Sequence, residues 1–267
     1  MKKLFYLTVA LFAFSACGTS STKDNDPWGN VDPETAPKQS FVVESSISSG
    51  ILNQKMSYSV WLPAGYDKTQ RYPFLYLLHG YEMGDQSRLD RCWLDKGNAS
   101  RIADNYVSAG GVPMIIVMPN GMSYFYQGDY ETYMHEELMP KVEADFKCNG
   151  NRAISGLSMG GYGTLYHALK YPSKFTYAYA MSPAADQSMA NMVTDVSALP
   201  GITIETGEQD GTTKLSSIRP FVNAMAKKGV EIDFIVRDGT HDWAFWQGCL
   251  PKALIKVGES FKQSKNQ

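Results

Sequence analysis

Residues 153–161 read AISGLSMGG, and this stretch decides the fold. A short apolar strand, Ala153-Ile154, precedes the glycines, and a helical pattern follows them. Gly156, Ser158 and Gly160 fit G-x-S-x-G, in which a serine lies on a tight turn between a strand and a helix. The helix N-terminus behind the serine favours negative charge that develops beside it. We therefore expect Ser158 to be a nucleophile, and the strand-to-helix context disfavours the alternative, a glycine-rich turn with an inert serine.

Strands and helices alternate along the rest of the chain. Apolar or alternating runs predict strands at residues 58–62, 74–78, 114–118, 153–154, 177–180, 202–204 and 232–236. Helical spacing predicts helices at residues 133–146, 160–171, 215–228 and 243–261. This alternation requires crossover connections, which give a mainly parallel sheet with helices on both faces. Because the sequence has no internal repeat, we predict one α/β domain over residues 40–267.

A serine hydroxyl needs a base that takes its proton and a carboxylate that orients the base. Of the four histidines, His79 ends an early strand, and His135 and His167 fall inside predicted helices. His241 lies in the loop between the last predicted strand and the last predicted helix. Because the chain order Ser, Asp, His is typical of a nucleophile on such a turn, we predict that His241 is the base.

The carboxylate is expected to follow a strand between Ser158 and His241. Asp210 meets this condition, because it follows the predicted strand 202–204. Asp242 is too close to His241 in the chain to serve easily. The remaining rivals are Glu208, Asp186 and Asp195.

An oxyanion hole requires backbone N–H groups that point to the developing charge on the carbonyl oxygen. The first is expected from Met159, directly after the nucleophile. The second is expected from the loop that follows Leu77-Leu78-His79-Gly80, at the N–H of Tyr81. A simple strand-ending turn at His79-Gly80 is the minority interpretation.

Aromatic residues near the predicted site are candidates for substrate binding. The segment 123–130 follows the carboxyl end of a predicted strand, where ligands bind in open α/β sheets. Its rings could stack on a phenolic acyl group or a sugar, or they could cover the end of the sheet. The candidates are Tyr124, Tyr126, Asp129, Trp243 and Trp246, with Tyr81 as a further ring near the oxyanion hole.

The N-terminus has the features of a targeting segment. Lys2 and Lys3 precede a short apolar run and the small residues before Cys17, which predicts a signal peptide over residues 1–16. Phe14-Ser15-Ala16-Cys17 resembles a bacterial lipobox, with Cys17 lipidated, although Phe14 departs from the usual Leu and cleavage nearby without lipidation is the alternative. The polar residues 17–39 predict a flexible tether. We therefore expect an exported, periplasmic or cell-surface lipoprotein of a bacterium, attached to the membrane only by its lipid.

Charge and motif spacing exclude several other functions. Lys and Arg number 25 against 27 Asp and Glu, a net charge of -2, so a basic surface for nucleic acid is not expected. His135-Glu136 begins like H-E-x-x-H, but Met139 stands where the second ligand is required, and the glycines at 156–161 lack a P-loop lysine. We expect no metal and no cofactor. Besides Cys17, the chain has three cysteines whose pairing the sequence leaves open and whose spacing does not fit zinc, Cys92, Cys148 and Cys249.

Five segments, taken together, resemble the putative-esterase family of α/β-hydrolases. They are residues 76–80, 119–121, 136–140, 154–161 and 239–243, within a matching region from Leu52 to Phe261. The family includes feruloyl and acetylxylan esterases, S-formylglutathione hydrolase and the mycolyltransferases. The resemblance implies an α/β-hydrolase fold, and it aligns Ser158, Asp210 and His241 with the nucleophile, acid and base of the family.

These features predict an exported serine carboxylesterase that removes acyl groups from plant cell-wall polysaccharide. The expected substrate is an ester-substituted carbohydrate or a phenolic ester, with feruloyl esters first and acetyl esters on xylan second. Export argues against an S-formylglutathione hydrolase, whose substrate is cytosolic. The alternative from a different class is a surface carbohydrate-binding protein with an idle triad.

Overall fold

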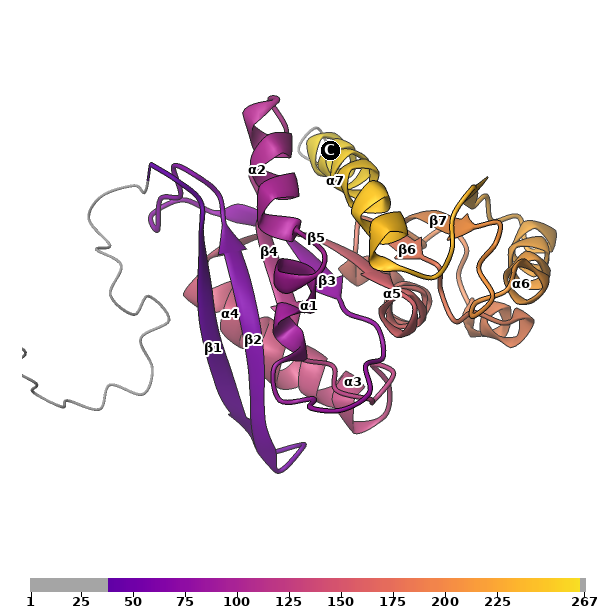
Figure 1. Cartoon of the computed structure of the whole chain (residues 1–267), viewed down its shortest axis with the longest axis horizontal. Coiled ribbons are helices and arrows are strands. Elements are labelled where there is room, and N and C mark those ends of the chain that lie inside the picture. Colours follow the sequence, from indigo (N-terminus) through magenta and orange to yellow (C-terminus); the bar gives the residue numbers. More distant parts are fainter. Residues whose placement is uncertain (1–37, 265–267) are drawn as a thin grey trace, which may run out of the picture.

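The computed structural model describes residues 38–264, and one eight-stranded sheet runs through this part of the chain (Figure 1). Its order is β1-β2-β4-β3-β5-β6-β7-β8. The strands are β1 (Phe41–Ser49), β2 (Gln54–Leu62), β3 (Tyr72–Leu78), β4 (Ile115–Pro119), β5 (Cys148–Leu157), β6 (Tyr177–Met181), β7 (Gly201–Gly207) and β8 (Asp233–Arg237). The strands from β4 to β8 are parallel, and β2 pairs antiparallel with both β1 and β4.

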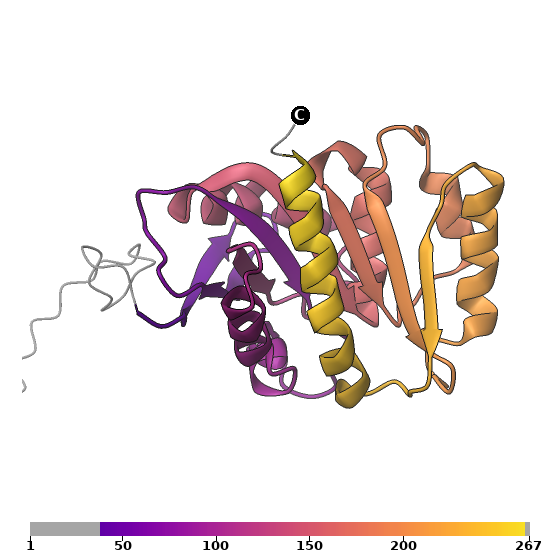
Figure 2. The ribbon, with the colours of Figure 1, turned by 90° about the horizontal axis from the view of Figure 1, so that it is seen from above.

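Helices cover both faces of the sheet, as the alternation of the sequence predicted. The α-helices are α1 (Cys92–Asp95), α2 (Ala99–Ser108), α3 (Asp129–Tyr133), α4 (Met139–Asp145), α5 (Met159–Lys170), α6 (Leu215–Lys227) and α7 (Trp243–Ser264). Shorter turns are η1 (Leu89–Arg91), η2 (Met134–Leu138, a π-helix), η3 (Pro172–Lys174) and η4 (Gln187–Met192). Figure 2 shows α7 lying across one face, with α5 and α6 on the other. The predicted mainly parallel α/β architecture is confirmed.

The central strands are buried because each contributes side chains to two separate cores. In β3, Phe74 and Tyr76 belong to the core under α5, whereas Leu75 and Leu77 belong to the core under α7. All seven residues of β3 are buried. A strand covered on both faces needs a continuous apolar run, and this is the pattern that residues 74–78 show.

Some elements were not predicted from the sequence. β1 is rich in serine and lacks a clear apolar alternation, but it is ordered by pairing along its whole length with β2, from Phe41 opposite Leu62 to Ser49 opposite Gln54. The helix α2 was also missed. The helix predicted at 133–146 is present as α3, the π-turn η2 and α4 in succession, and the strand predicted at 153–154 extends over all of β5.

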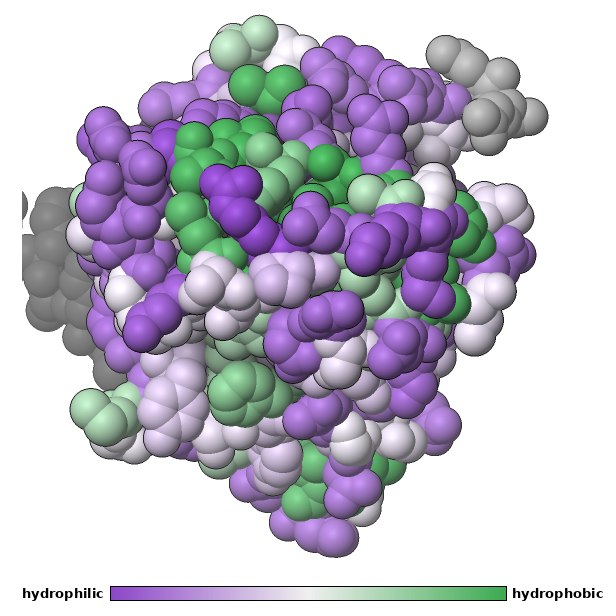
Figure 3. All heavy atoms as spheres, turned by 90° about the vertical axis from the view of Figure 1, so that its right-hand side faces the viewer, coloured by the Kyte–Doolittle hydropathy of each residue, from purple (hydrophilic) through white to green (hydrophobic). Residues whose placement is uncertain are grey.

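The edge strand β8 leaves apolar side chains at the surface. Residues 234–236 are half-buried, whereas the central strands are buried along most of their length. Figure 3 views the side of the molecule that carries α6, and it shows apolar atoms gathered in the upper part of this face between hydrophilic groups. Burial thus decreases towards this edge of the sheet.

Several sequence-based predictions concern the ends of the chain or its cysteines. The signal peptide, most of the tether and the lipidation of Cys17 lie outside the described residues. Within residues 38–264, no helix combines the length and apolar character needed to cross a bilayer. In the same part of the chain, three cysteines are buried and free, namely Cys92, Cys148 and Cys249.

Candidate active site

Ser158 lies at the turn where β5 ends and α5 begins. Its backbone has φ 54° and ψ −114°, so the chain reverses sharply at this residue. The turn is held close to β3, because a Cβ atom on Gly160 would lie 2.5 Å from the carbonyl oxygen of Leu78. The sequence therefore forms the predicted strand-turn-helix, and only glycine at position 160 allows this close approach.

The carboxyl ends of β5, β7 and β8 bring three distant side chains together. The Oγ atom of Ser158 lies 2.9 Å from Nε2 of His241. The Nδ1 atom of His241 lies 2.7 Å from Oδ2 of Asp210. This is the arrangement of a nucleophile, a base and an orienting carboxylate.

Asp210 is buried and surrounded by hydrogen-bond donors. Its Oδ1 atom accepts the backbone N–H groups of Thr212 at 2.9 Å and Thr213 at 2.8 Å. Its Oδ2 atom accepts the hydroxyl of Thr213 at 2.9 Å, besides the imidazole of His241. Burial alone would raise the pKa of Asp210, but the hydrogen bonds from His241 and Thr213 outweigh it and lower the pKa below its ordinary value.

The rival carboxylates lie elsewhere and have other partners. Asp186 is exposed and accepts the backbone N–H of Ser188, and Asp195 makes the same kind of turn with Ser197. Glu208 is exposed on the loop after β7. Asp242 accepts the N–H of Phe245 at the start of α7 through its Oδ1 atom, so it caps that helix.

His79 has a structural role in this arrangement. Its Nε2 atom accepts the backbone N–H of Gly121 at 2.7 Å, so the ring proton must lie on Nδ1, which donates to the carbonyl of Gly80 at 2.6 Å. Burial lowers the pKa of His79 to about 4, and the ring is neutral at ordinary pH. Both ring nitrogens are occupied, and His79 therefore fixes the end of β3 against the turn after β4.

The half-buried His135 and the buried His167 form a separate pair. Nε2 of His135 lies 3.0 Å from Nδ1 of His167, and the ammonium of Lys174 lies 3.0 Å from Nδ1 of His135. Burial is the main cause that lowers the pKa of His135 to about 4 and that of His167 to about 3. The two histidines contact each other and Lys174, and neither has a hydrogen bond to Ser158.

The backbone after β3 lies beside the nucleophile. A Cβ atom on Gly80 would lie 3.3 Å from Cβ of Ser158 and 2.5 Å from Cδ1 of Leu157. This contact places the peptide between Gly80 and Tyr81 next to the serine. Met159 is the first residue of α5, and the first N–H groups of a helix have no partner within it. Both expected oxyanion donors are therefore on backbone that adjoins Ser158.

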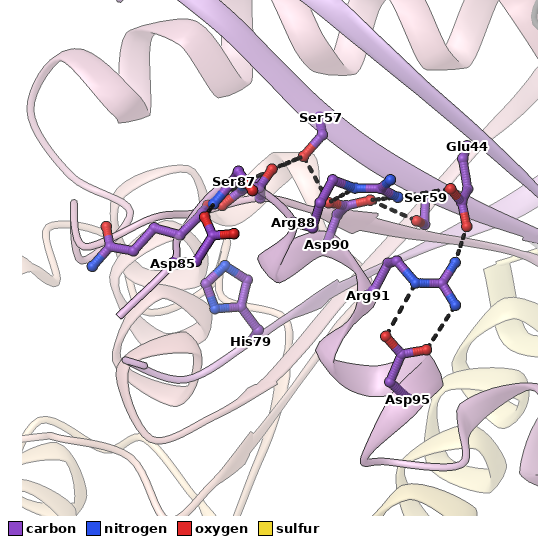
Figure 4. Close-up of polar contacts among 12 residues, drawn as sticks. Glu44, Ser57, Ser59, His79, Asp85, Ser87, Arg88, Asp90, Arg91 and Asp95 are labelled. Atoms are coloured by element: carbon purple, nitrogen blue, oxygen red, sulfur yellow. Dashed lines mark hydrogen bonds and ion pairs between the residues drawn. The ribbon is translucent and has the colours of Figure 1, made fainter. Parts of the chain in front are cut away.

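The far end of the same loop is anchored to β2 through Asp90. This buried carboxylate accepts the hydroxyls of Ser57 at 2.6 Å and Ser59 at 2.7 Å, and Arg88 also donates to it (Figure 4). Arg88 in turn pairs with Glu44 of β1 at 2.8 Å. The loop from residue 79 to residue 91 is thus fixed at both ends, by His79 and by Asp90.

The acid loop and the base loop are joined directly. Gln209 accepts the N–H of Gly239 through its side chain at 2.8 Å and donates its own N–H to the carbonyl of Gly239 at 3.1 Å. The backbone N–H of Glu208 donates to the carbonyl of Arg237 at 2.8 Å. These three hydrogen bonds keep the loops of Asp210 and His241 together.

The side chains of the 123–130 segment that were expected to contact a substrate differ in how deeply they are buried. Tyr126 is fully buried, and its hydroxyl donates to the carbonyl of His79 at 3.0 Å, which argues against contact with a substrate. Tyr124 is half-buried, packs against Tyr130 and accepts a hydrogen bond from Gln54. Phe125 and Tyr126 both have positive φ, and this local bend turns Tyr126 inward and leaves Phe125 exposed. Asp129 is exposed at the start of α3.

The tryptophans beside His241 form a continuous series. The ring of Trp246 is perpendicular to His241 with centroids 4.9 Å apart, and Trp243 is perpendicular to Trp246 at 5.4 Å. Trp93 continues the series at 5.4 Å and donates its indole N–H to the carbonyl of Leu78. Trp246 is only 6% exposed. Its ring therefore supports the base, whereas the half-buried Trp243 retains some exposed surface.

In the part of the chain that the structure describes, no group of three or more His, Cys, Asp or Glu side chains is placed to hold a metal ion. Sequence reasoning did not single out Thr213, Gln209 or Asp90. The spacing of Asp210 and Thr213 is typical of a carboxylate that bonds a residue three positions later, and it could have indicated Thr213. Gln209 and Asp90 depend on contacts between distant segments, which carry no local signal.

A known protein family matches the region that contains the candidate site. The model of the family described as putative esterase matches residues 49–257. The chain belongs to the putative esterase family. Ser158, Asp210 and His241 all lie inside the matched region. Like its relatives in the putative esterase family, the chain is a serine carboxylic-ester hydrolase.

Several individual proteins are also similar to this chain. An endo-1,4-beta-xylanase/feruloyl esterase of Xylanibacter ruminicola is 28% identical over 93% of this chain, which spans 37% of that relative's length. A solved ferulic acid esterase is 30% identical, with a TM-score of 0.75 over 84% of this chain and 99% of its own. A ferulic acid esterase of Anaeromyces mucronatus, 19% identical, has a TM-score of 0.68 over 88% of this chain and 96% of its own, and thus shares the fold. The predicted α/β-hydrolase fold is confirmed.

Proposed function

We propose that this esterase hydrolyses feruloyl esters of plant cell-wall polysaccharide. The observation that carries the proposal is the 30% identity to a ferulic acid esterase along nearly the whole of that protein. The relative from Xylanibacter ruminicola is named for xylanase and feruloyl esterase activity, which supports the same class of substrate. The substrate is then a phenolic ester on a carbohydrate.

The proposed mechanism uses the three side chains in the order of the hydrogen bonds. His241 takes the proton of the Ser158 hydroxyl through Nε2 as Oγ attacks the ester carbonyl, and Asp210 holds the proton on Nδ1 and stabilises the imidazolium. The N–H groups of Met159 and Tyr81 stabilise the negative oxygen of the tetrahedral intermediate. His241 then gives the proton to the sugar oxygen as the bond between that oxygen and the carbonyl carbon breaks, and the sugar leaves with a free hydroxyl. This step leaves an acyl-enzyme on Ser158.

Water resolves the acyl-enzyme by the same route. His241 removes a proton from the water as it attacks the acyl carbonyl, and it then protonates Oγ of Ser158 as the carbonyl–serine bond breaks. The products are the free acid and the restored serine. No cofactor takes part in either half of the reaction.

The acyl group is proposed to bind among exposed side chains next to the serine. Tyr81 is 52% exposed on the loop that adjoins Ser158, and Phe125 is 36% exposed beside Tyr162, with ring centroids 5.9 Å apart. Tyr162 lies one turn after Ser158 on α5, because its N–H donates to the carbonyl of Ser158. Aromatic walls of this kind suit a flat phenolic ring.

A deacetylase of xylan is the second candidate, and one observation favours it. Tyr126 is fully buried, and Tyr124 is tied to Gln54, so fewer rings are free to surround a phenolic acyl group than the sequence suggested. An acetyl group needs only a small pocket. In that case Tyr81 and Phe125 would contact the sugar.

The test compares methyl ferulate with an acetylated xylo-oligosaccharide by kcat/KM. We expect methyl ferulate to be the better substrate and Ser158→Ala to abolish the hydrolysis of both. A higher kcat/KM for the acetyl ester would replace the feruloyl assignment by deacetylation. Hydrolysis that is unchanged in Ser158→Ala would refute the serine mechanism itself, and binding of the oligosaccharide without hydrolysis by the wild type would point to a carbohydrate-binding protein.

We also propose that the protein is exported and anchored by a lipid at Cys17. The basis is the sequence of residues 1–17, with its two lysines, apolar run and terminal cysteine. Mass spectrometry of the native protein provides the test. A lipid-modified N-terminal Cys17 is the expected result, and an unmodified terminus beyond Cys17 would refute the anchor but not the export.

A further inference from the structure

Thr213 has three contacts with the acid and base of the candidate triad. Its backbone N–H donates to Oδ1 of Asp210 at 2.8 Å, and its hydroxyl donates to Oδ2 of Asp210 at 2.9 Å. The same hydroxyl oxygen lies 3.4 Å from Nδ1 of His241. Thr213 is only 7% exposed, so its hydroxyl has little access to water.

The hydroxyl completes the set of donors around the carboxylate. A carboxylate has about four positions that accept hydrogen bonds, two on each oxygen. On Oδ1 of Asp210 both are used by backbone N–H groups, from Thr212 and Thr213. On Oδ2 one is used by His241, and the Thr213 hydroxyl takes the other.

This position lets the hydroxyl act on the base through the carboxylate. It restrains rotation of the carboxylate, so that Oδ2 stays opposite Nδ1 of His241. This restraint favours the geometry of the reaction.

We propose that Thr213 is a positioning residue of this esterase, which acts through Asp210 to orient His241. The inference rests on the triad of the proposed function. Thr213 itself has no place in the reaction steps. Only the hydroxyl of its side chain acts on Asp210, so a serine at this position would preserve the function.

The experiment uses Thr213→Val, which removes the hydroxyl and keeps the shape, and Thr213→Ser, which keeps the hydroxyl. Thr69→Val is the matched control, because the Thr69 hydroxyl donates to the carboxylate of Asp67 at 2.7 Å in an exposed loop away from the site. The readouts are kcat and KM for p-nitrophenyl acetate and the midpoint of thermal unfolding.

We expect Thr213→Val to lower kcat about tenfold with little change in KM. Thr213→Ser should restore kcat, and Thr69→Val should behave as the wild type. The proposal is overturned if Thr213→Val keeps the wild-type kcat, or if Thr213→Ser is impaired as much as Thr213→Val.

A second pair of variants provides the test if Thr213→Val misfolds. If Thr213→Val does not fold, Thr213→Ala is compared with Thr213→Ser, because these two differ only by the hydroxyl. Equal kcat for this pair would refute the role of Thr213. Ser158→Ala tests the triad separately. If that variant is active, the triad is wrong, whereas an inactive Ser158→Ala together with an unaffected Thr213→Val refutes the positioning role alone.

Discussion

His241 Nε2 lies 2.9 Å from Ser158 Oγ, although 83 positions separate the two residues in the chain. The contact depends on the parallel sheet, because the carboxyl ends of β5 and β8 lie on the same side of the sheet and the loops that follow them meet there. The intervening strand β7 delivers Asp210 to the other side of the imidazole. The parallel sheet thus gathers the three side chains, with His241 between Ser158 and Asp210.

Replacement of His241 by alanine should remove the base. Because Ser158 then has no acceptor for its proton, we expect kcat for p-nitrophenyl acetate to fall by on the order of 10³-fold or more. His135→Gln is a suitable control, since His135 belongs to the separate pair with His167. Near wild-type turnover in His241→Ala would exclude His241 as the base.

Asp210→Asn should preserve the shape of the side chain and remove its charge. An amide group facing Nδ1 favours the wrong tautomer of His241, so we expect kcat to fall by on the order of 10³- to 10⁴-fold. Asp186→Asn serves as the control, because that carboxylate is exposed and bonds Ser188. If Asp186→Asn is the impaired variant, the assignment of the acid is reversed.

Gly80→Ala should displace the expected oxyanion donor at Tyr81. The new methyl group would lie 3.3 Å from Cβ of Ser158 and 2.5 Å from Leu157, so the loop or the serine must shift. We expect kcat to fall about tenfold or more, with a modest loss of stability. Gly50→Ala, whose nearest neighbour would be at an ordinary 3.5 Å, should leave kcat unchanged. Equal activity of both variants would place the oxyanion hole elsewhere.

The pair of His135 and His167 should make the fold sensitive to acid. Both have folded-state pKa values lowered from about 6.5, to about 4 and about 3. Above pH 6.5 both are neutral in the folded and unfolded chains, and their contribution to stability is complete. As the pH falls from 6.5 towards 4, the unfolded chain takes up protons that the folded chain does not, so the free energy of unfolding decreases by roughly 1 kcal/mol per pH unit and histidine.

Urea unfolding of the wild type and His135→Gln at several pH values between about 7 and 4.5 measures this effect. The variant should lose less stability than the wild type over this range. Parallel pH dependences in the two proteins would show that His135 is protonated equally in both states.

Chelation should leave the esterase active. The reaction proposed for Ser158, His241 and Asp210 moves protons between these groups and the substrate, and no step calls for a Lewis acid. We therefore expect the same kcat before and after dialysis against EDTA. Activity that is lost in EDTA and returns with a divalent ion contradicts this mechanism.

Much of the fold and the candidate nucleophile could be predicted from local sequence patterns. The G-x-S-x-G turn is defined by adjacent residues, and the buried strands by continuous apolar runs. His241 followed from chain order and from its place in a loop between β8 and α7. Asp210 was harder, because Glu208 and two further carboxylates fit the same stretch, and only the three-dimensional position of each one distinguishes them.

Other features could not be read from local patterns. β1 has weak alternation and gains its order from pairing with β2. Tyr126 looked like a substrate contact because it follows β4, but positive φ at Phe125 and Tyr126 turns its ring into the core. The role of Thr213 depends on a hydrogen bond to Asp210 that the sequence could only suggest. Each of these depends on which segments meet in the folded chain.

At position 158, thermal stability and catalytic turnover favour different residues. Its φ of 54° lies in the region that glycine adopts without penalty and that a residue with a side chain reaches at a cost of about 1–3 kcal/mol. Glycine at this one position would therefore give a more heat-resistant protein that has lost its nucleophile. A library of variants screened only for survival at high temperature would enrich such inactive chains. Engineering of this enzyme for thermal stability must therefore measure turnover in the same round of screening.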